Sequence, residues 1–277
     1  MRIILVTSNK LEHVYVANKL VTGVPLDGIV VDHGRRLGLL SNIRRLYRKY
    51  TLLQMASRLH MALMMRVWRD ESIGRESMIA AYGPENCLQF ARPDRLHHVR
   101  GINSPDGLQT VSSLQPDVLL VYGTVVVGSK IISLARIVAL NMHTGISPYY
   151  RGADCAFWPI YNRELHMVGA TVHECTKNID GGKIFGTTRA QLFPDDDVFS
   201  VFARSVIAGA DLYLRIVREL IAGRLIGVEQ DLSLGKEYRA LMRDVRAERK
   251  VRYAIKEGII RRYIESAHAD QKESHQC

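Results

Sequence analysis

Three polar side chains of the types that move acyl groups occur on two glycine-flanked turns. Residues 141–152 read Asn-Met-His-Thr-Gly-Ile-Ser-Pro-Tyr-Tyr-Arg-Gly, and residues 179–184 read Ile-Asp-Gly-Gly-Lys-Ile. Asn141 can donate a hydrogen bond to a developing oxyanion, His143 can donate a second or act as general acid, and Asp180 can orient the imidazole and accept a proton. Asn141 and His143 are two residues apart and therefore point to the same side of an extended chain. The set predicts acyl transfer to an amine.

Taken singly, either fragment has an ordinary explanation, since an Asp before two glycines is usually only a turn. Together the fragments resemble the folate-dependent formyltransferases over residues 117–220. The positions that match are Asn141, His143, Pro148, Arg151, Gly152, Trp158, Asn162, Glu164, residues 169–173, Asp180, Gly182 and Ile184. The resemblance implies that Asn141, His143 and Asp180 are catalytic. It also implies that 10-formyltetrahydrofolate is the formyl donor and that a primary amine accepts the group through a tetrahedral intermediate.

Two departures from the family's pattern concern the wall of the amine pocket. Residues 145–147 read Gly-Ile-Ser where the family commonly has Ser-Leu-Leu, and Arg163 replaces a usual glycine. Neither change removes a catalytic group. The resemblance therefore specifies the reaction more closely than the acceptor.

The elements that must position these residues follow from the hydrophobic pattern. Short apolar runs predict strands at residues 3–7, 28–31, 97–102, 117–122, 138–142, 168–175 and 183–190. Apolar spacings of three and four predict helices at residues 12–21, 39–68, 76–82, 104–114 and 199–220. The alternation predicts an α/β fold with a mostly parallel twisted sheet flanked by helices, and the resemblance makes it the Rossmann-like formyltransferase fold.

The chain divides by composition near residue 222. We assign residues 1–222 to a formyltransferase catalytic domain, with a basic helical insertion at residues 33–75. Residues 223–277 form a basic helical C-terminal extension, and the tail from Ser266 is expected to be disordered. Active groups of open α/β sheets collect at the carboxyl ends of strands. The turn at Ser8, Gly123 and His143 should therefore meet at one edge of the sheet.

The donor site is implied by position in the family. There the pterin lies between the loop after residues 117–122 and the loop that carries Asp180. This implicates Tyr122, Gly123, Thr124, Val125, Val126, Val127 and Asn178. The apolar run at residues 125–127 suits a flat heterocycle, although the same valines can equally belong to the core. The sequence lacks both a Gly-x-Gly-x-x-Gly fingerprint and a phosphate loop, so nicotinamide and nucleotide-hydrolysis chemistry lack support.

The acceptor site is predicted from two other turns. The residues that we assign to it are Ser8, Asn9, Lys10, His13, Tyr149, Tyr150 and Arg151. Lys10 and the start of the following helix can hold a phosphate, and Arg151 can pair with a phosphate or carboxylate. The simpler alternative is that these residues cap a helix, face water or hold their own loop.

The formal charge of +10 is concentrated in two segments. Residues 33–69 hold nine arginines or lysines and no acidic residue, and residues 236–263 hold ten basic and four acidic residues. Such helices can lie on an anionic membrane, bind RNA, dock an acidic protein or form a homodimer face. The apolar stretch near residues 61–68 favours packing or a membrane over RNA. The remaining alternative for both segments is a helix whose basic face is solvated and whose apolar side packs on the core.

Cysteine usage and hydropathy favour a cytoplasmic protein. The four cysteines have no paired spacing, which argues against a zinc site and a disulfide framework. No apolar run approaches the ~20 residues that span a bilayer, and the N-terminus reads as a strand rather than a signal peptide.

The sequence favours an amine formyltransferase that acts on a small molecule, with an amino sugar on a nucleotide as the preferred acceptor. An enzyme of the methionyl-tRNA formyltransferase type is the alternative that the arginines support. Only about 55 residues follow the catalytic body, which is short for that family's separate tRNA-binding domain. Hydrolysis of formyltetrahydrofolate and a non-catalytic binding protein are further alternatives.

Overall fold

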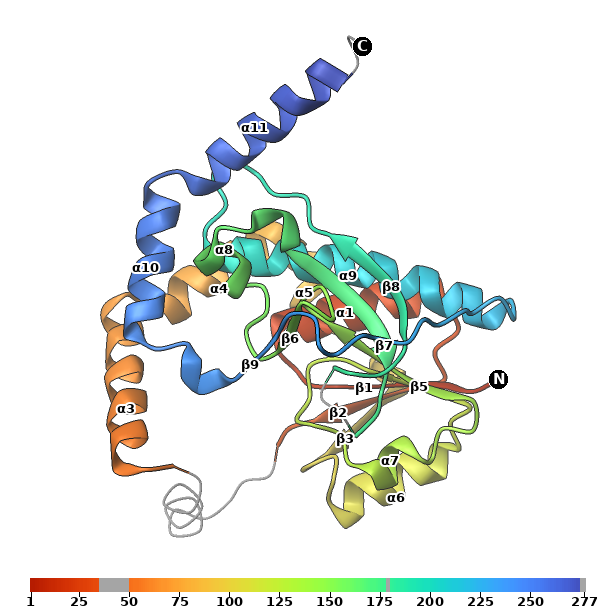
Figure 1. Ribbon diagram of the computed structural model, residues 1–277. Helices are drawn as coiled ribbons and strands as arrows, with labels where there is room; N and C mark the ends of the chain where they lie inside the picture. The colour runs from red at the N-terminus through yellow and green to blue at the C-terminus, as the bar shows by residue number, and fades with distance from the viewer. Residues whose placement is uncertain (35–49, 178–179, 275–277) are drawn as a thin grey trace.

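A seven-stranded sheet forms the centre of the protein in a computed structural model that describes residues 1–34, 50–177 and 180–274 (Figure 1). Its order is β3-β2-β1-β4-β5-β7-β8, and the first five of these strands run parallel. Strands β7 and β8 extend the sheet in antiparallel pairing. The strands are β1 (Ile3–Thr7), β2 (Gly28–Asp32), β3 (Leu96–Val99), β4 (Val118–Val121), β5 (Val138–His143), β7 (Gly169–Glu174) and β8 (Ile184–Arg189).

Helices cover both faces of this sheet (Figure 1). On one face lie α1 (Leu11–Gly23), α4 (Asp70–Tyr82), α5 (Pro84–Cys87) and α9 (Val198–Ile221). On the other lie α6 (Pro105–Leu114) and α7 (Ser129–Ile132). The inner strands β1 and β4 are buried along their whole length, as expected for parallel strands that are covered on both faces.

Local signals explain where two of the flanking helices, α6 and α9, begin. The Ser104 hydroxyl accepts a hydrogen bond from the Gly107 N–H at the start of α6, directly before Pro105. Asp197 accepts from the backbone N–H groups of residues 199 and 200 at the start of α9, and the Ser200 hydroxyl bonds the Asp197 N–H in return.

A second apolar cluster joins the catalytic half of the chain to its C-terminal part. It is built on the short strand β6 (Tyr150–Gly152) and helix α8 (Trp158–Asn162). Strand β9 (Lys236–Tyr238) pairs in parallel with β6, and α10 (Val245–Lys256) and α11 (Ile259–Ser274) continue from it. Helix α3 (Leu52–Val67) packs beside α4 and α10 at the outside of the molecule (Figure 1). Three short 3-10 turns complete the elements of the described residues, at Pro93–Arg95, Leu165–Met167 and Ala240–Met242.

The fold class expected from the sequence is confirmed, and each predicted strand has its counterpart. The predicted helix at residues 39–68 overlaps α3 from Leu52, while its part at residues 39–49 lies outside the described residues. The expectation of a disordered tail from Ser266 is wrong as far as Ser274, because α11 continues to that residue. The boundary at residue 222 stays a prediction. Within the described residues, no helix is both long and apolar enough to cross a membrane.

Candidate active site

The ends of three neighbouring strands bring the predicted catalytic residues together. In the antiparallel pair of β5 and β7, Asn141 lies opposite His173 and His143 lies opposite Thr171. On its other side β5 runs parallel to β4, with Asn141 beside Val121. Both Asn141 and His143 thus stand at the carboxyl end of a parallel strand, where sites of open sheets form.

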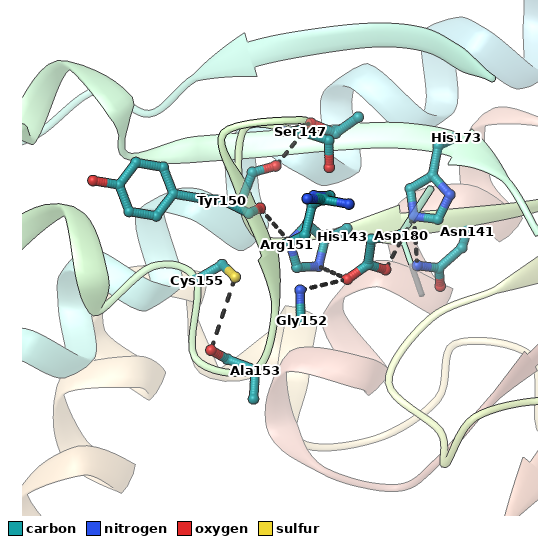
Figure 2. A network of polar contacts seen from close by, with 12 residues as sticks. Asn141, His143, Ser147, Tyr150, Arg151, Gly152, Ala153, Cys155, His173 and Asp180 are labelled. Carbon is teal, nitrogen blue, oxygen red and sulfur yellow. Dashed lines mark hydrogen bonds and ion pairs between the residues drawn. The ribbon is translucent and has the colours of Figure 1, made fainter. Parts of the chain in front are cut away.

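Asp180 sits at the centre of a polar network (Figure 2). Its Oδ2 lies 3.4 Å from His143 Nδ1 and accepts a 2.8 Å hydrogen bond from the Gly152 N–H. Its Oδ1 lies 3.2 Å from His173 Nε2. The backbone of Asp180 is left-handed, with φ +49°, as a tight turn that aims the carboxylate inward requires. One carboxylate therefore bridges two imidazoles from two strands.

Electrostatics favour the anionic form of Asp180 and the neutral form of His143. Burial alone would raise the pKa of the Asp180 carboxyl, but His143, His173 and the Gly152 N–H together hold it below its usual range. Burial lowers the pKa of His143 by more than the Asp180 charge raises it. His143 Nε2 lies 3.0 Å from the Tyr150 carbonyl oxygen, and its Nδ1 faces Asp180 Oδ2.

His173 is a member of this network that the sequence analysis did not assign. Its Nδ1 lies 2.8 Å from the Glu174 carbonyl oxygen, and its Nε2 lies 3.2 Å from both Asp180 Oδ1 and Asn141 Nδ2. His173 thus lies between the Glu174 carbonyl on one side and the Asp180 carboxylate and Asn141 amide on the other. The Asn141 amide nitrogen therefore faces His173 across the β5–β7 pair. No local pattern marks this role, because His173 meets Asn141 only through the pairing of β7 with β5.

A cavity of about 620 Å³ opens in front of these groups. Asn141, His143, His173 and Asp180 line it on one side, and the loop of residues 123–127 lines it on another. Its size and mixed polar and apolar walls match those of small-molecule sites. Within the described residues, no group of three or more His, Cys, Asp or Glu side chains is arranged to hold a metal ion.

The loop of residues 123–127 supplies the apolar wall. Val125 and Val126 are exposed into the cavity rather than buried in the core, whereas Val127 is buried. Asn103 Nδ2 donates to the Val126 carbonyl and its Oδ1 accepts from the Gly128 N–H, which holds the loop in place. These walls fit a flat heterocycle with an apolar face, so the predicted donor residues Gly123, Thr124, Val125, Val126 and Val127 line one surface.

Of the two other predicted donor residues, one lies in the core and the other is outside the described residues. The Tyr122 side chain belongs to the apolar core on the α1 side of the sheet, so only its backbone lies next to the loop. Asn178 lies outside the described residues. Cys175 also lines the cavity, but burial raises the pKa of its thiol to about 12, which argues against a thiolate nucleophile.

The predicted acceptor residues of the first turn are distributed over two places. Ser8 Oγ lies 2.5 Å from His13 Nδ1, and the buried His13 ring packs edge-on against Tyr122. Burial, with a smaller contribution from Lys10, lowers the pKa of His13 to about 3, so the ring is neutral. Lys10 is the N-cap residue of α1.

Asn9 lines a separate cavity of about 710 Å³ at the carboxyl ends of β2 and β3. Its other lining residues are His33, Gly34, His98, Val99, Arg100 and Asp106. The sequence analysis missed these residues because they follow two different strands and form no local motif.

The second predicted acceptor turn faces the C-terminal part of the chain. Arg151 donates to the carbonyl oxygens of Pro148 and Leu232, so its guanidinium fastens this turn to the C-terminal part. Tyr149 and Tyr150 line a different cavity, of about 590 Å³, together with Tyr238. The Tyr150 hydroxyl donates to the Glu164 carboxylate and accepts from the Asn162 amide. Its hydrogen bonds are therefore made within the protein.

Residues of the C-terminal part also form a wall of the catalytic cavity. Through the pairing of β9 with β6, residues 237–240 line it opposite Asn141. A Cβ at Gly152 would lie 2.3 Å from the Tyr238 carbonyl oxygen, and the φ of Gly152 is +92°. Only glycine permits this approach, so the Gly152 of the sequence motif serves the contact between the two strands.

Comparisons with known proteins agree with this geometry. Residues 60–217 match a family model described as formyl transferase. The methionyl-tRNA formyltransferase of Chlorobium chlorochromatii is 28% identical over 148 residues, which cover 53% of this chain and 47% of that protein. This chain spans about half the length of the curated relatives it matches.

Solved structures share the fold at low identity. A sugar N-formyltransferase from Shewanella sp has a TM-score of 0.50 at 16% identity, covering 86% of this chain and 76% of that chain. Glycinamide ribonucleotide transformylase 1 from Symbiobacterium toebii has a TM-score of 0.53 at 15% identity, covering 83% and 95%. These likenesses establish the architecture of the sheet and its helices.

Proposed function

Because the chain belongs to the formyl transferase family, we propose that it transfers a formyl group from 10-formyltetrahydrofolate to a primary amine. The observation that carries the proposal is the convergence of Asn141, His143 and Asp180 on one cavity, with His143 Nδ1 3.4 Å from Asp180 Oδ2. A neutral imidazole beside a buried anion can take up a proton, because the anion stabilises the imidazolium that forms. A side-chain amide can donate a hydrogen bond to an oxyanion. Formyl transfer requires both.

The donor, when bound, supplies the activated formyl carbonyl. Gly123 and the valines of residues 125–127 offer it an apolar wall, and Asn141, which lines the same cavity, offers a donor amide. The Asn141 side chain lines the same cavity as these walls, and its NH₂ group can donate a hydrogen bond to the formyl oxygen. One such donor lowers a barrier by roughly 3–4 kcal/mol.

His143 and Asp180 hold the proton that the amine loses. The Nδ1 of His143 is the basic nitrogen, because its Nε2 proton is engaged by the Tyr150 carbonyl. A proton on Nδ1 lies next to the Asp180 carboxylate, whose charge stabilises the imidazolium. His173 fixes the other carboxylate oxygen and thereby orients Asp180.

For the acceptor we propose an amino sugar carried on a nucleotide. The cavity beside Asn9 supports this choice, because His33, His98 and Arg100 give it polar and cationic walls that suit phosphate or ribose hydroxyls. It lies at the same edge of the sheet as the catalytic cavity, since both follow the carboxyl ends of parallel strands. Initiator tRNA is the second candidate acceptor, which the relatives' identity and the basic segments favour.

A reaction panel tests the proposal and separates the acceptors. The protein is incubated with 10-formyltetrahydrofolate and, in turn, nucleotide-linked amino sugars, charged initiator tRNA or no amine, and the folate product is measured. We expect turnover only with an amino-sugar nucleotide. Turnover with tRNA alone would select the second candidate, and release without any amine would identify a hydrolase.

Variants test the assignment of the catalytic groups. Asn141→Ala and His143→Ala should each lower kcat by about 10²–10³-fold or more, while calorimetric affinity for a stable folate analogue changes little. The matched control is Asn103→Ala, which removes the support of the donor loop and should weaken folate binding more than it lowers kcat. Wild-type turnover in either catalytic variant would refute the mechanism.

A further inference from the structure

Helix α3 presents a row of apolar side chains that nothing in the described structure covers. Leu52, Leu59, Leu63 and Val67 are 73%, 73%, 58% and 65% exposed. Their spacing of seven, four and four residues places them on one face along the whole helix. No residue of α3 is buried. An apolar face of this length on a described surface marks an interaction site.

The chain segment that carries this face has basic residues and no acidic ones. Between residues 50 and 69 the chain contains Arg58, Arg66 and Arg69 and no Asp or Glu. The next acidic residue, Asp70, is buried and paired with Arg252 at 2.6 Å. The preceding residues 35–49 add six arginines or lysines to the sequence, again without an acid. The partner of this face should therefore be both apolar and anionic.

The face continues toward the catalytic cavity through a groove. Residues 240–243 lie against α3 and enclose with it a cavity of about 480 Å³ that Met55, Leu59, Ala62 and Met65 line on the helix side. Ala240 lines this groove and the catalytic cavity as well. Leu241 and Met242, next to it, are partly exposed apolar side chains. Apolar surface thus runs from α3 to the rim of the active site.

We propose that α3 and residues 240–242 dock the protein on the surface of an anionic lipid bilayer. Leucines at the centre of the face would enter the boundary between headgroups and acyl chains, and the arginines would meet anionic headgroups. The proposal does not depend on which amine is the acceptor. It places the opening of the catalytic cavity next to the membrane.

Charge complementarity selects the bilayer over the other occupants. Two copies of the chain meeting through this face would bring like charges together, with no acidic residue between residues 50 and 69 to compensate. RNA would neutralise the arginines but leave the leucines of residues 52, 59 and 63 exposed to water. A bilayer with anionic lipids satisfies both kinds of side chain.

Co-sedimentation with vesicles tests the proposal. The full chain is mixed with vesicles of phosphatidylcholine alone, or of equal parts phosphatidylcholine and phosphatidylglycerol, at low and high salt. We expect binding to the mixed vesicles, weakened by salt, and at least tenfold weaker binding to the neutral ones. The variant Leu59→Glu/Leu63→Glu should reduce binding to the mixed vesicles at least tenfold.

The control variant is Ile137→Glu/Ile226→Glu, which adds the same charge at two exposed isoleucines outside α3, 59% and 81% exposed. It should bind the mixed vesicles within about twofold of wild type. Thermal unfolding of both variants checks that they are folded. Equal binding by the α3 variant and the control would overturn the proposal, as would a lack of wild-type binding. A concentration-dependent dimer or a tRNA complex that only the α3 variant loses would also overturn it, in favour of those partners.

Discussion

The cluster around Asp180 and the outer face of α3 differ in what they bury and what they expose. Around Asp180 the charge is buried, and both carboxylate oxygens have partners within 3.4 Å. On α3 the apolar side chains are exposed, and the charged residues of the helix itself are all arginines. A buried charge persists only when it is paired, so the first region is complete by itself. The second region is incomplete until something apolar covers it.

The two regions also differ in how the sequence builds them. The cluster joins residues from β5, from β7 and from the turn before β8, so it exists only when the sheet has formed. The α3 face arises from a single helix whose spacing is visible in the sequence. Substitutions should therefore affect chemistry or folding at the first region and association at the second.

The largest expected effect is that of Asp180→Asn on turnover. The neutral amide keeps the size of the side chain but cannot stabilise an imidazolium on His143, so kcat should fall by about 10²–10⁴-fold. Single-turnover kinetics with saturating donor measure this directly. Unchanged kcat would show that the buried charge is structural and remove the contrast with α3.

The next effect concerns the support beneath the site. The buried hydroxyl of Tyr213 accepts from the Val121 N–H at 3.0 Å and donates to the Leu140 carbonyl at 2.8 Å, which ties β4 to β5. Tyr213→Phe leaves both groups unpaired and should lower the free energy of unfolding by about 1–3 kcal/mol in denaturant titration. The control Tyr253→Phe, at an exposed tyrosine, should leave it unchanged.

The dependence of kcat/KM on pH tests how burial and the Asp180 charge set the pKa of His143. Burial lowers the pKa of His143, so the acidic limb should have its midpoint below 6.5 and the rate should be level above it. Asp180 raises that pKa, and Asp180→Asn should therefore move the midpoint further toward acid while lowering the rate. A midpoint that moves upward would contradict the assignment of His143 as the base.

The smallest effect is the expected stability change at α3. Leu63→Ala should change the free energy of unfolding by less than about 0.5 kcal/mol, because the side chain is exposed. Leu20→Ala on α1, at a fully buried leucine, should cost about 2–5 kcal/mol. Equal costs in denaturant titration would mean that the α3 face is covered within the protein itself.

Much of the sheet could be predicted from the sequence, because runs such as Val118–Val121 are apolar throughout and bounded by turns. The convergence of Asn141, His143 and Asp180 was also predicted, through their placement after strands and through the family resemblance. Their catalytic roles stay predictions. His173 was missed because its role arises only from pairing across β5 and β7.

Short and long-range features were the least predictable. Strands β6 and β9 have three residues each, too few for a hydrophobic period to show, and they pair across about 80 residues of chain. The helix to Ser274 was missed because its polar composition resembles a solvated tail. His13 was predicted to face the acceptor, but its burial against Gly123 follows from a close approach that no local pattern announces.

Because β9 pairs with β6, the proposed catalytic residues and part of the cavity wall come from different parts of the chain. The groups proposed to move the formyl group and its proton come from the sheet, whereas residues 237–240, which close the same cavity, come from the C-terminal part of the chain. A change in the sequence or length of that later segment would therefore alter the wall that meets the amine and leave the proposed catalytic residues in place. Gly152 contacts β9 through backbone atoms alone, so this contact does not depend on which side chains β9 carries.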